Sequence, residues 1–258
     1  MKRRRTFKLT IEYDGTNYSG WQRQDNADTI QQRIEEVLGK IFQQKTTIYG
    51  SGRTDAGVHA IAQTASFSID ARGSRGIVKA GRRPDCKRIR LALNSLLPGD
   101  IVITEVRETA QDFHARKSAG AKRYCYLVLN GANASALHRR RCYFYGCALN
   151  PARMRRAAKF LKGRHSFRAF SSESFREKSY VRDLRRLTIS KDGPLFTFTF
   201  EADGFLYNMI RNIVGTLLEV GRGRMEPEEV HAILKSENRA LAGPKTPPHG
   251  LYLEKVFY

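Results

Sequence analysis

The sequence feature that most constrains the fold is a change of hydrophobic period that occurs in each half of the chain. Apolar side chains alternate over Phe7–Tyr13 as in a strand, and then recur at helical spacing over Thr29–Phe42, with Asp28 as the expected N-cap. The second half repeats this order, with a strand over Arg123–Leu129 and a helix that begins at Asn150-Pro151 and ends at Gly163. Such a chain needs sheets whose apolar face is covered by helices.

The remaining elements complete two similar halves. A strand over residues 61–69 places alternate side chains on one face, namely Ile61, Gln63, Ala65, Phe67 and Ile69. The most clearly amphipathic helix spans residues 206–221. Further helices and strands are expected over residues 87–97, 101–106, 184–190, 195–202, 228–236 and 251–257. We therefore predict an α+β fold of two α/β-type domains, residues 1–110 and 111–258, each with a mostly antiparallel or mixed sheet and helices on one side.

The charge of the chain indicates a polyanionic partner. Its 258 residues include 46 Lys and Arg against 25 Asp and Glu, a formal net charge of +21, and this much self-repulsion is typical of nucleic-acid binding. No apolar run approaches the length of a membrane span, and the opening Met1–Arg5 lacks the apolar core of a secretory signal. These features predict a cytoplasmic protein without membrane contact.

One basic segment and the cysteines carry no catalytic assignment. Residues 71–90 hold eight Lys or Arg and one acid, Asp85, and both a solvated loop and a phosphate contact fit that composition. Cys142 and Cys147 are five residues apart without a second pair, while Cys86 and Cys125 stand alone. We therefore expect neither a disulfide framework nor a metal site.

The stretch Gly50–Ala60, here called the aspartate loop, carries the strongest functional signal. It places Asp55 among glycines and two residues after Arg53, so a carboxylate beside a guanidinium would stay ionised and accessible for nucleophilic attack. A simple turn in which Asp55 bonds neighbouring amides and Arg53 is solvated fits the same residues. His59 of this loop and Trp21 upstream are interpreted as packing and loop support.

The aspartate loop resembles the catalytic-aspartate motif of the TruA family of tRNA pseudouridine synthases. Other segments match motifs of the same family in the same order, which makes the resemblance specific and extends it over nearly the whole chain. They are Tyr13–Gln24, Leu97–Ile101, Asp112–Arg116, Lys122–Tyr126, Gly204–Gly215 and Gly250–Leu253.

The resemblance implies a pseudouridine synthase fold, two domains joined across a basic cleft, and a cofactor-independent isomerisation of uridine. Asp55 would be the nucleophile at C1′ or the base that yields a glycal, and Arg53 would fill the space left by the flipped base. Tyr124 would stack on the extruded uracil, and Arg211 would pair with Asp55. On residue type alone, Tyr124 is a half-buried strand aromatic and Arg211 is an arginine that lies along the core edge.

The same resemblance implies a tRNA partner, modification at positions 38–40 of the anticodon stem-loop, and a homodimer. The expected RNA contacts form two groups, which are Phe113, His114, Ala115, Arg116 and Lys117, and Ser174, Phe175, Arg176, Glu177 and Lys178. A catalytically silent RNA-binding module on the same scaffold, or a basic ribosome-associated protein, would share the charge but would not need the aspartate loop.

Overall fold

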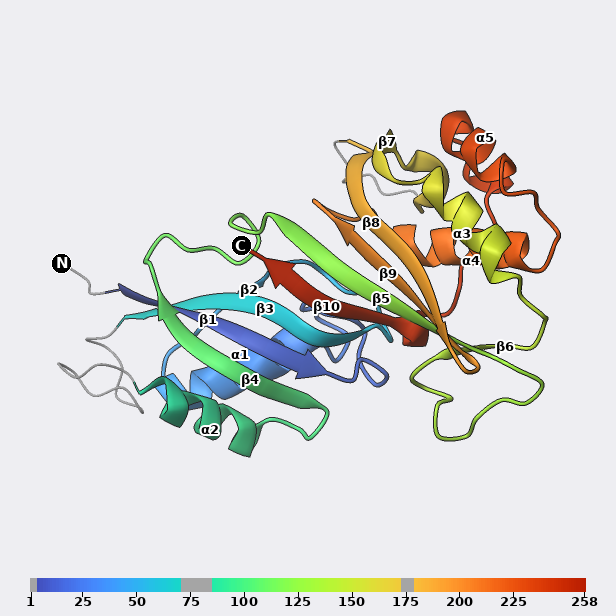
Figure 1. The fold of residues 1–258 in the computed structure, drawn as a ribbon. Coiled ribbons are helices and arrows are strands. Elements are labelled where there is room, and N and C mark those ends of the chain that lie inside the picture. The colour runs from blue at the N-terminus through green and yellow to red at the C-terminus, as the bar shows by residue number, and fades with distance from the viewer. Residues whose placement is uncertain (1–3, 71–84, 173–178) are drawn as a thin grey trace. The chain divides into compact units, whose positions relative to one another are not determined.

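The computed structural model describes residues 4–70, 85–172 and 179–258, and the chain divides into two compact units (Figure 1). The first unit contains Met1–Gly120 together with Leu253–Tyr258, and the second contains Ala121–Tyr252. The division therefore comes at Gly120 rather than after residue 110, and the end of the chain belongs to the first unit. Sequence periodicity does not show that the last strand joins the first unit, because it identifies helices and strands but not which of them pack together.

Antiparallel strands form the sheet of the first unit. Strand β1 lies in the middle and pairs with both β3 and β4, and the short strand β2 pairs with β3. The last strand of the chain, β10, borders β3. The bounds of these strands are Arg4–Tyr13 for β1, Ile48–Gly50 for β2, His59–Asp70 for β3, Ile101–Thr109 for β4 and Leu251–Phe257 for β10.

Two helices pack against this sheet, α1 (Ile30–Phe42) and α2 (Cys86–Leu96). The ring of Phe67 on β3 packs between those of Phe7 on β1 and Phe42 on α1, with centroids 5.2 and 5.7 Å away. These side chains are almost fully buried, so they form the centre of the first unit's core.

The expected N-cap of α1 is wrong by one residue. Thr29 caps the helix, with extended backbone and a side-chain oxygen that accepts from Gln32 N–H at 3.4 Å. Asp28 instead binds the guanidinium of Arg33 through both carboxylate oxygens, at 2.7 and 2.5 Å. Asp28 and Thr29 are adjacent and both suit an N-cap, so residue propensity alone does not show which of them caps the helix. Asp28 is occupied by its ion pair with Arg33, and Thr29 caps the helix.

Strand β3 contains an irregularity that sequence alternation did not reveal. The β1–β3 register shifts between Ile11, which pairs with Gln63, and Tyr13, which pairs with Ala60. This bulge places one extra residue on β3, and Ile61 within it is 47% exposed. The prediction that Ile61 lies on the same face of the strand as Phe67 is therefore wrong, because a bulge breaks the two-residue period.

The second unit has a sheet with the order β5-β9-β8-β7, in which neighbouring strands are antiparallel, and β6 pairs in parallel with β5. Its buried face is rich in phenylalanine, because alternate residues of β9 are Phe196, Phe198 and Phe200. The strand bounds are Ala121–Asn130 for β5, Tyr143–Tyr145 for β6, Gly163–Ser166 for β7, Val181–Asp192 for β8 and Leu195–Ala202 for β9.

The helices of the second unit are α3 (Pro151–Lys159), α4 (Met209–Gly221) and α5 (Glu229–Ser236). As expected, Asn150 caps α3 and accepts from the backbone N–H groups of two residues in its first turn. The helix ends at Lys159 and not at Gly163, which has φ +103° and begins β7. Short 3₁₀ turns follow at Arg168–Phe170, Arg239–Leu241 and Pro248–Gly250.

Both units thus combine mostly antiparallel strands with packed helices, which confirms the α+β class. Across residues 4–70, 85–172 and 179–258, no helix is long and apolar enough to cross a membrane. None of the four cysteines, all of which are described, is joined in a disulfide.

Candidate active site

Backbone hydrogen bonds hold the aspartate loop against the N-terminal segment of the first unit. Trp21 N–H donates to the carbonyl of Thr54 at 3.0 Å, and Gly57 N–H donates to the carbonyl of Tyr18 at 3.4 Å. These bonds lie on both sides of Asp55 in the sequence. Two segments that match family motifs are therefore packed on each other, and the position of the Asp55 backbone depends on the N-terminal one.

Two glycines allow this close packing. A Cβ atom on Gly20 would lie 2.6 Å from the carbonyl oxygen of Thr54, and Gly20 also has φ +92°, which disfavours any other residue. A Cβ atom on Gly50 would lie 2.6 Å from the indole ring of Trp21, which is 2% exposed. The interpretation of Trp21 as loop support agrees with this contact.

Side-chain hydrogen bonds from the strands below also fix the aspartate loop. The hydroxyls of Tyr13 and Thr54 are 2.7 Å apart, and burial raises the pKa of the Tyr13 phenol, so it remains neutral. Gln63 of β3 accepts from the Ser51 hydroxyl at 2.7 Å and donates to the Gly52 carbonyl at 2.9 Å. The loop is therefore anchored before and beside Asp55 rather than held by its own turn alone.

Asp55 and Arg53 differ in exposure. Asp55 is half-buried and follows the buried Thr54, whereas Arg53 is exposed. The Nε of Arg53 donates to Oε1 of Gln22 at 3.1 Å, so the N-terminal segment holds this guanidinium. From the sequence, we expected the Arg53 guanidinium to lie beside the Asp55 carboxylate. In the structure, Arg53 donates this hydrogen bond to Gln22.

Arg211 lies on α4 of the second unit and is 9% exposed. Its Nε donates to the Thr246 carbonyl at 2.7 Å, and its Nη1 donates to Oδ1 of Asn208 at 2.9 Å. The Arg211 carbonyl in turn accepts from the Thr246 hydroxyl at 3.1 Å. A buried guanidinium with two fixed hydrogen bonds has a defined orientation, which a solvated arginine lacks.

Sequence reasoning did not identify Asn208 and Thr246 as partners of Arg211. Asn208 precedes Arg211 by three residues, a spacing that brings side chains together at the start of a helix, so this contact had a local signal. Thr246 is 35 residues away in the chain, and no local pattern indicates the contact.

Tyr124 lies on β5 and is 7% exposed. It pairs across the sheet with Phe200 of β9, and its ring meets the edge of Phe205 at a centroid distance of 5.1 Å and an angle of 77°. Phe205 belongs to the Gly204–Gly215 segment that also contains Arg211. In the second unit, two motif segments are thus brought together at the Tyr124 ring.

The expected RNA-binding residues Phe113–Lys117 lie in the first unit, although the predicted boundary placed them in the second domain. Ala115 N–H donates to the Ser66 hydroxyl at 3.0 Å, and the Ala115 carbonyl accepts from the hydroxyl of Tyr258 at 3.0 Å. Burial raises the pKa of Tyr258 to about 12, so this donor keeps its proton at neutral pH. The last residue of the chain therefore holds this loop.

The second group of expected RNA contacts, Ser174, Phe175, Arg176, Glu177 and Lys178, lies outside the described residues. Most of the basic segment 71–90 also lies outside them. Its described part begins at Asp85, which caps α2 and accepts from the N–H groups of Lys87 and Arg88.

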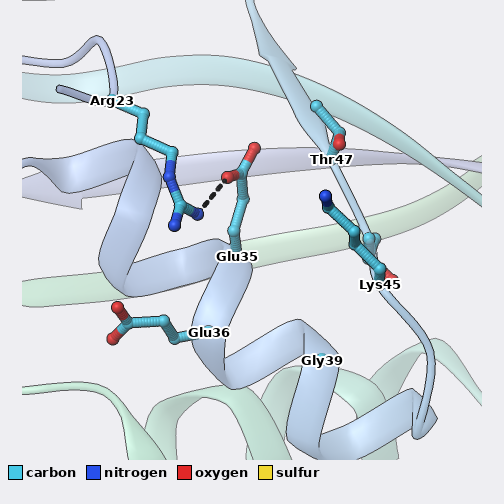
Figure 2. Close-up of a pocket in the computed structure, with 7 residues that line it drawn as sticks. Arg23, Glu35, Glu36, Gly39, Lys45 and Thr47 are labelled. Carbon is cyan, nitrogen blue, oxygen red and sulfur yellow. Dashed lines mark hydrogen bonds and ion pairs between the residues drawn. The ribbon is translucent and has the colours of Figure 1, made fainter. Parts of the chain in front are cut away.

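Each unit has a surface cavity that the proposed catalytic residues do not line. The cavity of the first unit, about 270 Å³, lies beside α1, and Figure 2 shows Glu35 there with its ion pair to Arg23. The cavity of the second unit, about 550 Å³, lies where α3 begins and α4 ends. Neither is lined by Asp55, Tyr124 or Arg211. Within the described ranges, no group of three or more His, Cys, Asp or Glu is placed to hold a metal ion.

Comparison with known proteins identifies the family that shares these motif segments. A family model described as tRNA pseudouridine synthase matches residues 9–116 and 157–258, which include Asp55 and Arg211. Tyr124 lies between the two matched segments, so its assignment rests on the Lys122–Tyr126 motif.

Curated relatives match over 98 to 100% of their length. The proteins named tRNA pseudouridine synthase A 2 from Clostridium perfringens and tRNA pseudouridine synthase A from Acetivibrio thermocellus are each 44% identical over 254 residues, which are 98% of this chain and 100% of each relative. A relative with the second name from Clostridium acetobutylicum is 42% identical over 251 residues, 97% of this chain and 98% of that protein. The chain therefore belongs to the tRNA pseudouridine synthase family.

Proposed function

We propose that this protein isomerises uridine to pseudouridine in the anticodon stem-loop of tRNA, at positions 38–40, with Asp55 as the nucleophile. Membership of the family supports the reaction class. The observation that carries the residue assignment is the anchoring of the aspartate loop on both sides of Asp55, with Asp55 half-buried and the neighbouring Thr54 held by Tyr13. Such anchoring places a carboxylate reproducibly without burying it completely.

The reaction exchanges one glycosidic bond for another. The bond from ribose C1′ to uracil N1 breaks, the Asp55 carboxylate attacks C1′, and a bond from C1′ to C5 replaces the ester. The C5 proton is lost and N1 gains one, so the reaction is redox-neutral and atoms balance without a cofactor. Loss of a ribose proton to give a glycal is the other course that a carboxylate at this position supports.

Three further residues have proposed roles in this reaction. Tyr124 stacks on the extruded base, a contact typically worth ~1–3 kcal/mol. Arg211 supplies a fixed cation that keeps the reacting carboxylate ionised, consistent with its two fixed hydrogen bonds. The exposed Arg53 fills the space left in the RNA and contacts phosphate, and this binding offsets the few kcal/mol that base flipping costs.

The net charge of +21 supports tRNA as the partner. We propose in addition that the protein acts in the cytoplasm and as a homodimer, as the resemblance to the family implies. Light scattering at micromolar concentration tests the homodimer, because a monomer mass at all concentrations would contradict it.

The decisive experiment replaces Asp55 with Asn and maps pseudouridine in treated tRNA. We expect Asp55→Asn to bind tRNA with unchanged affinity and to form no pseudouridine at positions 38–40, because the amide is a poor nucleophile at C1′. Asp25→Asn is the matched control, since Asp25 is exposed on the same unit and the substitution removes the same charge. Full activity of Asp55→Asn would refute the assignment, and modification at other positions only would refute the proposed site in tRNA.

A further inference from the structure

An exposed aromatic side chain that no motif includes lies beside the Phe113–Lys117 loop. Tyr49 of β2 is 48% exposed, and its ring centroid is 5.0 Å from that of His114, with 36° between the ring planes. In the part of the chain that the structure describes, the Tyr49 hydroxyl has no hydrogen-bond partner. Figure 1 locates β2 and the segment between β4 and β5 that contains His114. We call Tyr49 and His114 the aromatic platform.

The loop side of the platform is rigid. The Nδ1 of His114 accepts from the backbone N–H groups of Arg116 and Lys117, at 3.1 and 3.4 Å, which fixes the ring relative to its own loop. Strand pairing places Tyr49 opposite Ser66, and the Ser66 hydroxyl accepts from the Ala115 N–H. The residue opposite Tyr49 in the sheet therefore also holds the loop that carries His114.

The loop that carries His114 also carries two cations. Arg116 and Lys117 come two and three residues after His114 and are exposed. A third cation is near this loop, because the Nζ of Lys8 lies 4.3 Å from the ring centroid of Tyr258 and 5.8 Å from that of Phe113. A preorganised, exposed aromatic beside exposed cations is the arrangement by which proteins hold single-stranded nucleic acid, with bases on the rings and phosphates on the cations.

We propose that the aromatic platform is a stacking site for an unpaired base of the tRNA, with the adjacent phosphates held by Arg116 and Lys117. This proposal rests on the proposed function and adds Tyr49 as a contact that the family motifs do not include. Tyr49 precedes Asp55 by six residues, so their Cα atoms are at most about 20 Å apart even for extended chain. One RNA can therefore reach both positions.

Stacking and phosphate contacts have different salt dependence, which makes the proposal testable. Titration of tRNA at several salt concentrations should show that Tyr49→Ala weakens binding about 5- to 100-fold with an unchanged slope of log K against log salt. Arg116→Ala and Lys117→Ala should each reduce the magnitude of that slope by about one. Tyr49→Phe should bind as the unchanged protein does, because the phenyl ring retains the stacking face.

Leu91→Ala is the matched control, because Leu91 is 55% exposed on α2 of the same unit. Binding by Tyr49→Ala that equals binding by Leu91→Ala would overturn the proposal, and so would a loss in Tyr49→Ala accompanied by a changed salt slope. All binding is also measured in an Asp55→Asn background. A stacking site that fails then shows as unchanged binding in Tyr49→Ala, whereas a wrong catalytic assignment shows as isomerisation by Asp55→Asn.

Discussion

Asn208 holds the guanidinium of Arg211 from a strained backbone position. Its Oδ1 accepts from Arg211 Nη1 at 2.9 Å, while its own φ is +60°, a left-handed conformation that few residues other than glycine adopt. The Nδ2 of Asn208 donates to the Ser172 hydroxyl at 2.8 Å, so the amide is fixed at both ends. This position requires a side chain that accepts from an arginine and a residue that tolerates a left-handed backbone. Asparagine meets both requirements, which explains its place before α4.

The first prediction follows from this pair. Asn208→Gly retains the left-handed backbone but removes the acceptor from a buried guanidinium, so we expect a loss of about 1.5–3 kcal/mol in the free energy of unfolding. If Arg211 acts in the reaction, single-turnover rates should fall about 10- to 100-fold with little change in tRNA affinity. Ser172→Ala, which leaves the contact between Asn208 and Arg211 in place, should show smaller changes in both. Equal effects of the two substitutions would contradict a positioning role for Asn208.

The second prediction concerns alkaline stability. Burial raises the pKa of Tyr13, so its contribution to stability is complete below the ordinary tyrosine pKa of about 10 and is lost as pH rises toward the folded value. Tyr13→Phe should cost about 1 kcal/mol at pH 7, because the hydrogen bond to Thr54 is lost, yet its stability should fall less steeply above pH 10. Urea unfolding at pH 7 and from pH 9 to 11.5 measures both quantities. A parallel decline of the two proteins above pH 10 would be inconsistent with a buried neutral phenol.

The third prediction tests the close packing at the aspartate loop. Gly20→Ala places a Cβ 2.6 Å from the Thr54 carbonyl oxygen at a φ of +92°, so strain and overpacking together should cost about 2–4 kcal/mol. The activity of the folded fraction should also fall, because Thr54 precedes Asp55. Gly99→Ala is the control, since a Cβ there meets nothing within 4 Å. Chemical denaturation and isomerisation assays of both variants give the comparison, and indistinguishable variants would exclude this steric account.

The fourth prediction concerns the buried carboxylate in Figure 2. Glu35 accepts from Ile48 N–H at 3.0 Å and from Arg23 at 3.1 Å, with its side chain 8% exposed. Glu35→Ala leaves the buried Ile48 N–H without this acceptor, and we expect a loss of about 1–3 kcal/mol in the free energy of unfolding. Glu36→Ala removes an exposed carboxylate from the next position of α1 and should change stability by less than about 0.5 kcal/mol. Equal losses in the two variants would show that the buried contacts do not matter.

Local patterns in the sequence predicted helices and strands better than the contacts between them. The period of the apolar residues located β1, α1 and α4, and the Asn150-Pro151 pair located the start of α3, because each signal lies within one element. The exposure of Ile61 escaped prediction, since a bulge depends on pairing with β1. The motifs identified the aspartate loop and Arg211, but the hydrogen bond from Arg211 to Thr246 joins positions that are distant in sequence. Residues Phe113–Lys117 were assigned to the wrong unit because the contact that holds them, from Tyr258 to Ala115, also joins distant positions.

The return of Leu253–Tyr258 to the first unit has a consequence for biosynthesis. Residues up to Gly120 are translated before the second unit, yet β10 and the Tyr258 hydroxyl that holds the Ala115 carbonyl are translated after most or all of it. A nascent chain that has been translated only as far as Gly120 therefore lacks β10, the strand that borders β3. The first unit can therefore be completed only after the whole of the second unit has been translated.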